Sequence, residues 1–95
     1  EARQLIEKAL ALAPDDGFIL DSMGWVLYRQ GDLAGALTYL ERSYAKREDP
    51  EVAAHLGEVL WALGRQDDAR RVLQAAQKAH PTNEALAETV RKLIP

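Results

Sequence analysis

The sequence predicts an all-α fold built from repeated pairs of antiparallel helices. Apolar residues recur at three- and four-residue spacing, the period of an α-helix, along most of the chain. Alanine and leucine dominate and β-branched residues are few, which favours helix over strand. A shift of 33 residues also aligns one part of the sequence with another. The 95 residues are enough for one domain with a modest core.

The first half of the chain is predicted to form three helices. Proline disrupts a helix interior, so the first helix stops before Pro14. Glycine is a common residue just past a helix C-terminus, so the second helix ends at Gly31. The third ends in the polar stretch before Pro50. The predicted ranges are 2–13, 17–30 and 33–47.

The second half is predicted to form three more helices joined by short turns. Gly64 stops the fourth helix, and the fifth ends before Pro81. Asn83 is a favourable N-cap, so the last helix starts near it and runs to Ile94. The predicted ranges are 51–63, 66–79 and 83–94.

A glycine recurs in the middle of two predicted helices, 33 residues apart. Glycine inside a helix costs about 0.5–1 kcal/mol relative to alanine, so its repetition needs a physical reason. We expect Gly24 to lie opposite Ala36, and Gly57 opposite Ala69, where the two helices of each pair cross closely. The aligned positions are Gly24 with Gly57, Leu27 with Leu60, Gly31 with Gly64, Ala36 with Ala69, and Leu40 with Leu73.

This pattern resembles the tetratricopeptide repeat (TPR) family. That family has Leu-Gly early in its first helix, glycine at the turn, alanine and then a large apolar residue in its second helix, and proline at the end. The resemblance implies helix pairs stacked in a right-handed superhelix. It divides the chain into the second helix of a truncated repeat at 1–16, full repeats at 17–49 and 50–83, and a C-terminal capping helix at 84–95.

Three positions depart from the family pattern. Leu27 fills the usual tyrosine site, and Tyr28 lies one position later. Ser43 replaces a common alanine, and Pro50 comes two residues late. These departures are expected to change the local packing angles between helices, and they leave the predicted fold unchanged.

Two stretches, DSMGWVLYRQGD and HLGEVLWALGRQDDAR, also resemble the C-terminal repeats of Gram-negative TPR lipoproteins. This resemblance implies a location at the periplasmic face of the outer membrane, with a cytoplasmic location as the alternative. It also implies an adaptor that brings substrates to carboxyl-terminal processing proteases. Because the chain begins without methionine and inside a helical pattern, we expect it to be part of a longer protein.

The first helix of each TPR pair lines a concave face that usually contacts ligands. Helical periodicity places Trp25 and Tyr28 one turn apart on that side, with Trp61 on the neighbouring helix. Aromatic residues beside an arginine are enriched in binding hot spots, while packing between repeats is the alternative for each of them. The predicted partner-binding residues are Phe18, Asp21, Trp25, Tyr28, Arg29, His55, Glu58 and Trp61.

The charged residues do not indicate a site for an acidic partner. TPR domains that grip an acidic C-terminal peptide carry lysine and asparagine at set positions, where this chain has Asp21, Trp25 and His55. The basic residues of the second helices are expected to lie on a solvated face rather than in a binding patch. They are Arg42, Arg65, Arg70, Arg71 and Lys78.

No pattern in the sequence indicates catalysis, a cofactor, nucleic acid or membrane insertion. The net charge of −3 argues against nucleic acid, and no apolar run approaches the roughly 18–20 residues of a membrane span. His55 and Glu58 lack a third metal ligand in the sequence pattern. The acidic pairs at 15–16 and 67–68 suit helix N-termini better than catalysis.

The sequence therefore predicts a non-enzymatic domain that binds a protein or peptide on the concave TPR face. The alternative is that these repeats complete a longer superhelix or self-associate without a ligand site of their own. The first helix favours self-association, because its apolar residues Leu5, Ile6 and Leu12 lack a neighbour within the sequence given. This predicts a possible homo-oligomer through the first helix.

Overall fold

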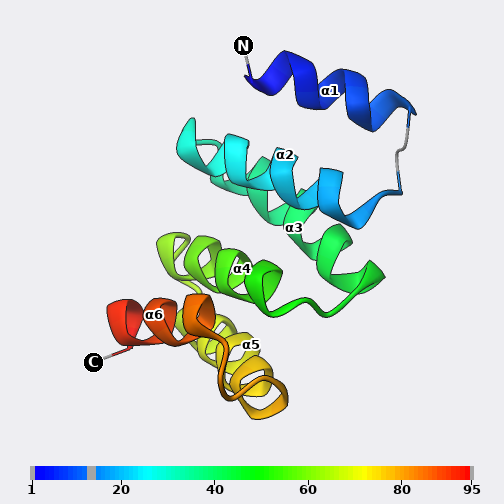
Figure 1. Ribbon diagram of the computed structural model, residues 1–95. Helices are drawn as coiled ribbons and strands as arrows, with labels where there is room; N and C mark the ends of the chain where they lie inside the picture. The colour runs from blue at the N-terminus through cyan, green and yellow to red at the C-terminus, as the bar shows by residue number, and fades with distance from the viewer. Residues whose placement is uncertain (1, 13–14, 95) are drawn as a thin grey trace. The chain divides into compact units, whose positions relative to one another are not determined.

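A computed structural model describes residues 2–12 and 15–94, with the side chains of 4–12 and 15–94. Within that part of the chain all regular structure is α-helical, so the all-α prediction is confirmed (Figure 1). Helix ends agree with the predicted ones to within one or two residues, but residue 13 and Pro14, at the predicted end of the first helix, lie outside the described residues. The helices are α1 (Ala2–Leu12), α2 (Gly17–Arg29), α3 (Leu33–Lys46), α4 (Pro50–Ala62), α5 (Gln66–Ala79) and α6 (Glu84–Leu93).

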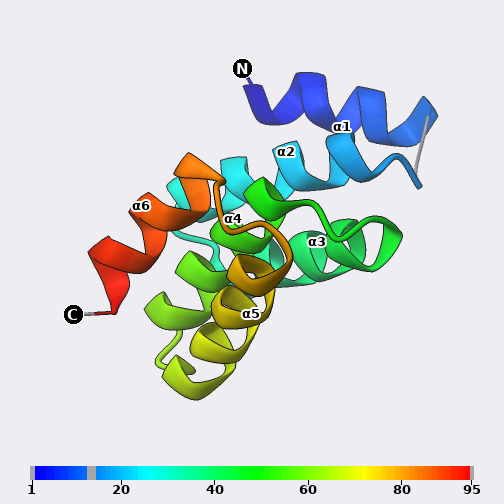
Figure 2. The ribbon, with the colours of Figure 1, turned by 60° about the horizontal axis from the view of Figure 1, so that its bottom comes forward.

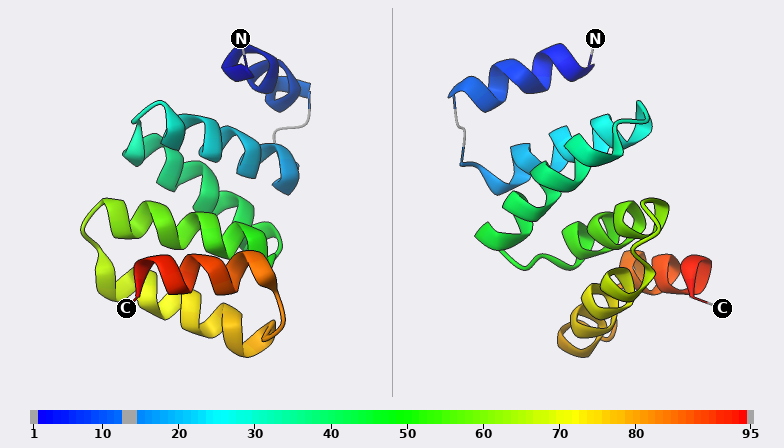
Figure 3. Two further views of the ribbon diagram at one scale, coloured as in Figure 1. Left: turned by 60° about the vertical axis from the view of Figure 1, so that its left-hand side comes forward. Right: turned by 180° about the vertical axis from the view of Figure 1, so that it is seen from behind.

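The chain forms two compact units, residues 1–47 and 48–95. In the first unit α2 packs against both α1 and α3, and the antiparallel course of α2 and α3 is visible in Figures 1 and 2. In the second unit α4 packs against both α5 and α6, as Figure 3 shows. Each unit is thus a helical hairpin that carries one further helix against its first helix, α2 or α4.

Glycines with positive φ end the first helix of both hairpins. Gly31 has a φ of 89° and Gly64 a φ of 82°, a region that side chains disfavour. The amide of Asp32 donates to the Leu27 carbonyl at 2.9 Å, and the amide of Arg65 donates to the Leu60 carbonyl at 2.9 Å. These six-to-one bonds satisfy terminal carbonyls of α2 and α4. Both glycines therefore act as the predicted helix stops.

Acidic and amide side chains cap most of the described helix N-termini. Each cap accepts a hydrogen bond from a backbone amide in the first turn, which would otherwise have no partner within the helix. The predicted cap at Asn83 is confirmed, with its Oδ1 3.0 Å from the Leu86 amide. The other side-chain caps are Asp16 for α2, Asp32 for α3 and Asp49 for α4.

Leucines cover the two mid-helix glycines at the points where the helices of each hairpin cross. A Cβ on Gly24 would stand 2.7 Å from Cγ of Leu40 and 3.2 Å from the Ala36 carbonyl oxygen. A Cβ on Gly57 would stand 2.6 Å from Cγ of Leu73. The predicted close crossing is confirmed: the Ala36 backbone lies at contact distance from Gly24, and the leucine one turn after each alanine fills the space that the glycine leaves.

Ser43 is buried and links α3 to the start of α2. Its side chain is 2% exposed, and its hydroxyl donates to the Gly17 carbonyl at 2.7 Å. A buried hydroxyl without a partner would destabilise the fold, so this bond accounts for serine at a position where small apolar residues are common. The bond holds the two ends of the α2–α3 hairpin together.

Replacing Gly57 by valine is expected to destabilise the protein by about 2 kcal/mol. Valine has a better helix propensity than glycine, so any destabilisation arises from the clash with Leu73. Urea unfolding monitored by circular dichroism measures the change. The control is Ala62→Val, which adds the same side chain at an exposed position of α4. Equal stability of the two variants would contradict the close crossing.

Replacing Ser43 by alanine is expected to lower the free energy of unfolding by about 1 kcal/mol, the net value of one buried hydrogen bond. The matched change is Thr38→Ala, which removes an exposed hydroxyl that donates to the Ala34 carbonyl within the same helix. That control should change stability by less than about 0.5 kcal/mol. If both variants unfold at the same urea concentration, the Ser43 bond contributes nothing to stability.

Candidate functional site

An aromatic pair lies on α2 in the first unit. The rings of Trp25 and Tyr28 are stacked, with centroids 4.9 Å apart and planes inclined by 25°. Both side chains are partly exposed. Their three-residue separation places them on one side of the helix, as predicted. The stack therefore leaves part of both aromatic side chains exposed, although their facing sides cover each other.

The same side of α2 continues toward its N-terminus and ends in an exposed phenylalanine. Phe18 is 80% exposed, and Asp21 lies between it and Trp25, partly exposed. Arg29 is exposed at the other end of the helix. Because seven residues correspond to nearly two turns, Phe18 and Trp25 point in almost the same direction. We call Phe18, Trp25 and Tyr28 the aromatic stripe.

The second unit carries a different arrangement on α4. Trp61 is partly exposed, and the guanidinium carbon of Arg70 lies 5.6 Å from the centroid of its ring. This distance is within the range of a cation–π interaction. His55 is also partly exposed on α4. Trp61 is therefore held by a cation from α5, a contact that the sequence pattern did not reveal.

Glu58 of α4 forms an ion pair with Lys92 of α6. The Glu58 side chain is only 12% exposed, whereas that of Lys92 is 65% exposed. Leu86 of α6 is completely buried. Glu58 therefore contributes to holding α6 on α4, in addition to any contact with a partner.

The predicted partner-binding residues thus fall into two groups, one in each unit. That the two groups form one surface stays a prediction. The group on α2 is Phe18, Asp21, Trp25, Tyr28 and Arg29, and the group on α4 is His55, Glu58 and Trp61.

The basic residues of α3 and α5 are exposed as expected, but several have specific partners. Arg42 lies over the ring of Tyr39, with 5.6 Å between the guanidinium carbon and the ring centroid. Asp68 accepts hydrogen bonds from Arg65 at 2.9 Å and from Arg71 at 3.0 Å. This network at the start of α5 explains Asp68 structurally. These basic residues were expected only to be solvated, so their specific partners were not predicted.

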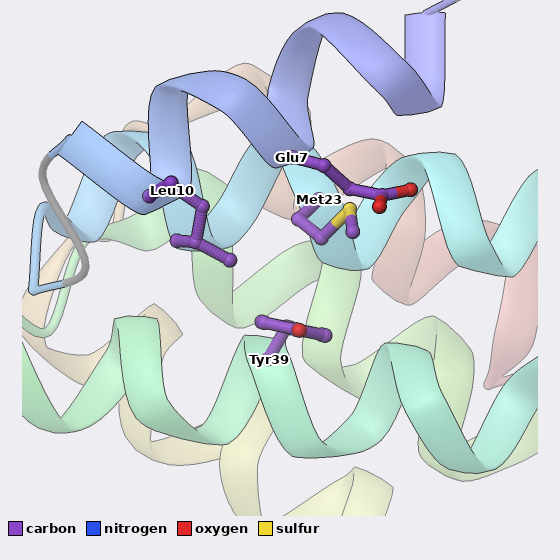
Figure 4. A pocket seen from close by; sticks show the side chains of 5 residues that line it. Glu7, Leu10, Met23 and Tyr39 are labelled. Carbon is purple, nitrogen blue, oxygen red and sulfur yellow. The ribbon is translucent and has the colours of Figure 1, made fainter.

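A shallow cleft of about 380 Å³ separates α1 from α3 in the first unit (Figure 4). Met23 of α2 forms its floor, Glu7 and Leu10 border it on α1, and Tyr39 borders it on α3. Met23 and Trp25 are two residues apart, so helical periodicity points them to nearly opposite sides of α2. The cleft is therefore distinct from the aromatic stripe.

The exposed side of α1 is apolar in part. Leu5 is 67% exposed and Leu12 is 88% exposed, while Ile6 is partly covered. The predicted inner residues of this helix, Ile6, Ala9 and Leu10, are those that lose most of their exposure among its described side chains.

Two findings on the described residues concern metal binding and membrane insertion. In the described ranges, no group of three or more histidine, cysteine or acidic residues is arranged to hold a metal ion. None of the described helices combines the length and apolarity needed to cross a bilayer.

Paired helices with a glycine at each close crossing and a glycine at each turn define a helical-repeat protein. A sequence profile described as the tetratricopeptide repeat matches residues 22–84, about two thirds of the chain. The chain belongs to the tetratricopeptide repeat family.

Two curated relatives carry repeats similar to this chain. The "TPR repeat-containing protein PA4667" of Pseudomonas aeruginosa is 62% identical over 58 residues, which are 61% of this chain and 10% of that protein. The "Tetratricopeptide repeat protein 21B" of Homo sapiens is 33% identical over 87 residues, which are 92% of this chain and 7% of that protein. This chain spans a tenth or less of the length of these relatives. The family generally mediates protein–protein interaction, and its members are typically non-enzymatic scaffolds.

The Glu58–Lys92 pair is expected to couple α6 to α4 by roughly 1 kcal/mol at low salt, and by less as salt is added. A double-mutant cycle with Glu58→Gln and Lys92→Met measures this coupling from urea unfolding.

The control cycle uses Asp15 and Lys46, whose charged atoms are 3.8 Å apart with side chains 77% and 50% exposed. Solvent screening should reduce that coupling to about zero. The same coupling energy in both cycles would show that burial of Glu58 adds nothing to its ion pair.

Proposed function

We propose that this chain binds a peptide segment or partner protein through the outward sides of α2 and α4. The proposed contacts are the eight residues predicted from the sequence: Phe18, Asp21, Trp25, Tyr28, Arg29, His55, Glu58 and Trp61. The single observation that carries the proposal is the partly exposed stack of Trp25 and Tyr28 on α2.

Exposed aromatic surface supports this proposal energetically. Full burial of a phenylalanine side chain is worth about 1.5–3 kcal/mol relative to exposure, and Phe18 is 80% exposed. Trp25 and Tyr28 are held in place by their mutual stacking, so a partner does not need to order them. Arg29 at the end of the same helix adds a charged hydrogen-bond donor. Aromatic residues and arginine are the types most enriched in binding hot spots.

The proposed setting is an adaptor in the bacterial envelope, at the periplasmic face of the outer membrane. Two stretches of the sequence resemble TPR lipoproteins, and a relative in Pseudomonas aeruginosa shares 62% identity over 58 residues. In this setting the bound partner is a protease or a protein that the adaptor presents to it.

The second candidate function is completion or self-association of a longer superhelix. It is favoured by one observation, the exposure of Leu5 and Leu12 on the same side of α1. Their seven-residue spacing makes an apolar stripe of the kind that packs against another helix. A second copy of the chain is the partner that this candidate proposes.

The partner-binding proposal predicts that a Trp25→Ala/Trp61→Ala variant loses a partner that the wild-type chain retains from a bacterial envelope extract. Retained proteins are identified by mass spectrometry. Each candidate is then purified, and its affinity is measured by calorimetry. We expect at least a tenfold loss of affinity for the double variant, since aromatic hot spots contribute about 2 kcal/mol or more each.

The control variant is Leu12→Ala, which removes an exposed apolar side chain from α1. Circular dichroism checks that all variants remain folded. Equal affinity of the wild type and the folded double variant would contradict the proposed surface. Loss of binding with Leu12→Ala alone would favour the α1 surface instead.

A further inference from the structure

We infer that the aromatic stripe of α2 recognises a proline-rich segment in the polyproline II conformation, with two prolines three residues apart. This inference rests on the proposed function of the same face and names the class of segment that the face accepts. The stripe lies entirely within the first unit, on a single helix, so helix geometry fixes the spacing of the backbone positions that carry its rings.

The spacing of the backbone positions of Phe18 and Trp25 is close to the repeat of a polyproline II helix. Phe18 and Trp25 are seven residues apart, which corresponds to a rise of about 10.5 Å along an α-helix. Two prolines three residues apart in polyproline II are separated by about 9.3 Å and lie on the same side of the segment. One proline ring can therefore face Phe18 while the next faces Trp25.

The form of the aromatic surface suits proline rings. The rings of Trp25 and Tyr28 stack on each other, so an outer face or the edges of the stack remain for contact with a proline ring. Proline-rich segments commonly dock on aromatic-lined surfaces, because they are already extended and lose little conformational entropy on binding. Phe18 supplies a second, more exposed ring at the start of the helix.

The charge on the stripe argues against an amphipathic helix as the occupant. Asp21 lies between Phe18 and Trp25, and a helix that laid a continuous apolar face there would cover this carboxylate with apolar groups. A polyproline II segment has three residues per turn, so its two intervening residues lie to either side of the proline-bearing edge, and a long side chain there can reach Asp21 from the flank. Charge complementarity then favours a basic residue between the prolines, near Asp21, and an acidic residue beyond the second proline, near Arg29.

The test uses a synthetic twelve-residue peptide in which proline occurs at every third position and one lysine follows each proline. A second twelve-residue peptide has the same composition, but its four prolines are placed so that no two are three residues apart. Binding is followed by the indole N–H signals in the ¹H–¹⁵N spectrum of the purified chain. The chain has two tryptophans, one in each unit, so the Trp61 signal is an internal reference for the Trp25 signal.

The first peptide is expected to shift the Trp25 signal in a saturable way and to leave the Trp61 signal unchanged. Affinities of the variants are measured by calorimetry, because variants at position 25 lack the Trp25 signal. Affinity should fall at least tenfold with Trp25→Ala and about fivefold with Phe18→Ala, and Trp25→Phe should restore part of it. Leu12→Ala is the matched control for Phe18→Ala, because both side chains are at least 80% exposed. Replacing the lysines of the peptide by glutamate should weaken binding, and Asp21→Asn should reduce that difference.

Equal binding of the two proline spacings, or an unchanged affinity of Phe18→Ala, would overturn the inference. Failure of this inference can be distinguished from failure of the proposed function. If a purified partner requires Trp25 but the proline peptide does not bind, the surface is correct and the polyproline class is wrong. If neither binds through Trp25, both proposals fail. Preference for a helical peptide from the partner would replace the polyproline segment with an amphipathic helix.

Discussion

The packing of a leucine over a bare helix backbone determines the geometry of both hairpins. Leu40 covers Gly24 and Leu73 covers Gly57, and both leucines are completely buried. A glycine in a helix weakens that helix locally, so the arrangement is stable only because the closer approach brings more apolar atoms into contact. With the crossing point fixed, helical periodicity decides which residues of α2 and α4 point away from the partner helix.

The elements of this fold could be predicted because their boundaries depend on local chemistry. Gly31 and Gly64 adopt positive φ, and Asn83 caps α6, so each acts within a few residues of its own position. The close crossings were predictable in kind from the 33-residue repetition. Their atomic detail was not, because which atoms of the second helix cover each glycine depends on side-chain direction along that helix.

Among the side-chain pairs of the candidate site, the pair within a single helix could be predicted, and the pairs between helices could not. The stack of Trp25 and Tyr28 follows from a three-residue spacing on one helix, and periodicity alone brings these rings together. The pair of Glu58 and Lys92 joins residues 34 positions apart on different helices. This pair depends on how α6 packs against α4, which no local sequence pattern indicates. The contact of Arg70 with Trp61 has the same origin, since it joins α5 to α4.

Repetition constrains the inner positions of the two hairpins and leaves the outer ones free to differ. Glycine and leucine recur at the crossings, whereas Trp25 of α2 corresponds to Glu58 of α4, and Phe18 corresponds to Glu51. The same backbone arrangement therefore presents an aromatic surface in one unit and an ion pair in the other. Because outward side chains contribute little to the crossing itself, their chemistry can change without loss of the hairpin. A phenylalanine that is 80% exposed at such a position contributes little to folding, which is the physical reason why the proposed recognition surface includes Phe18.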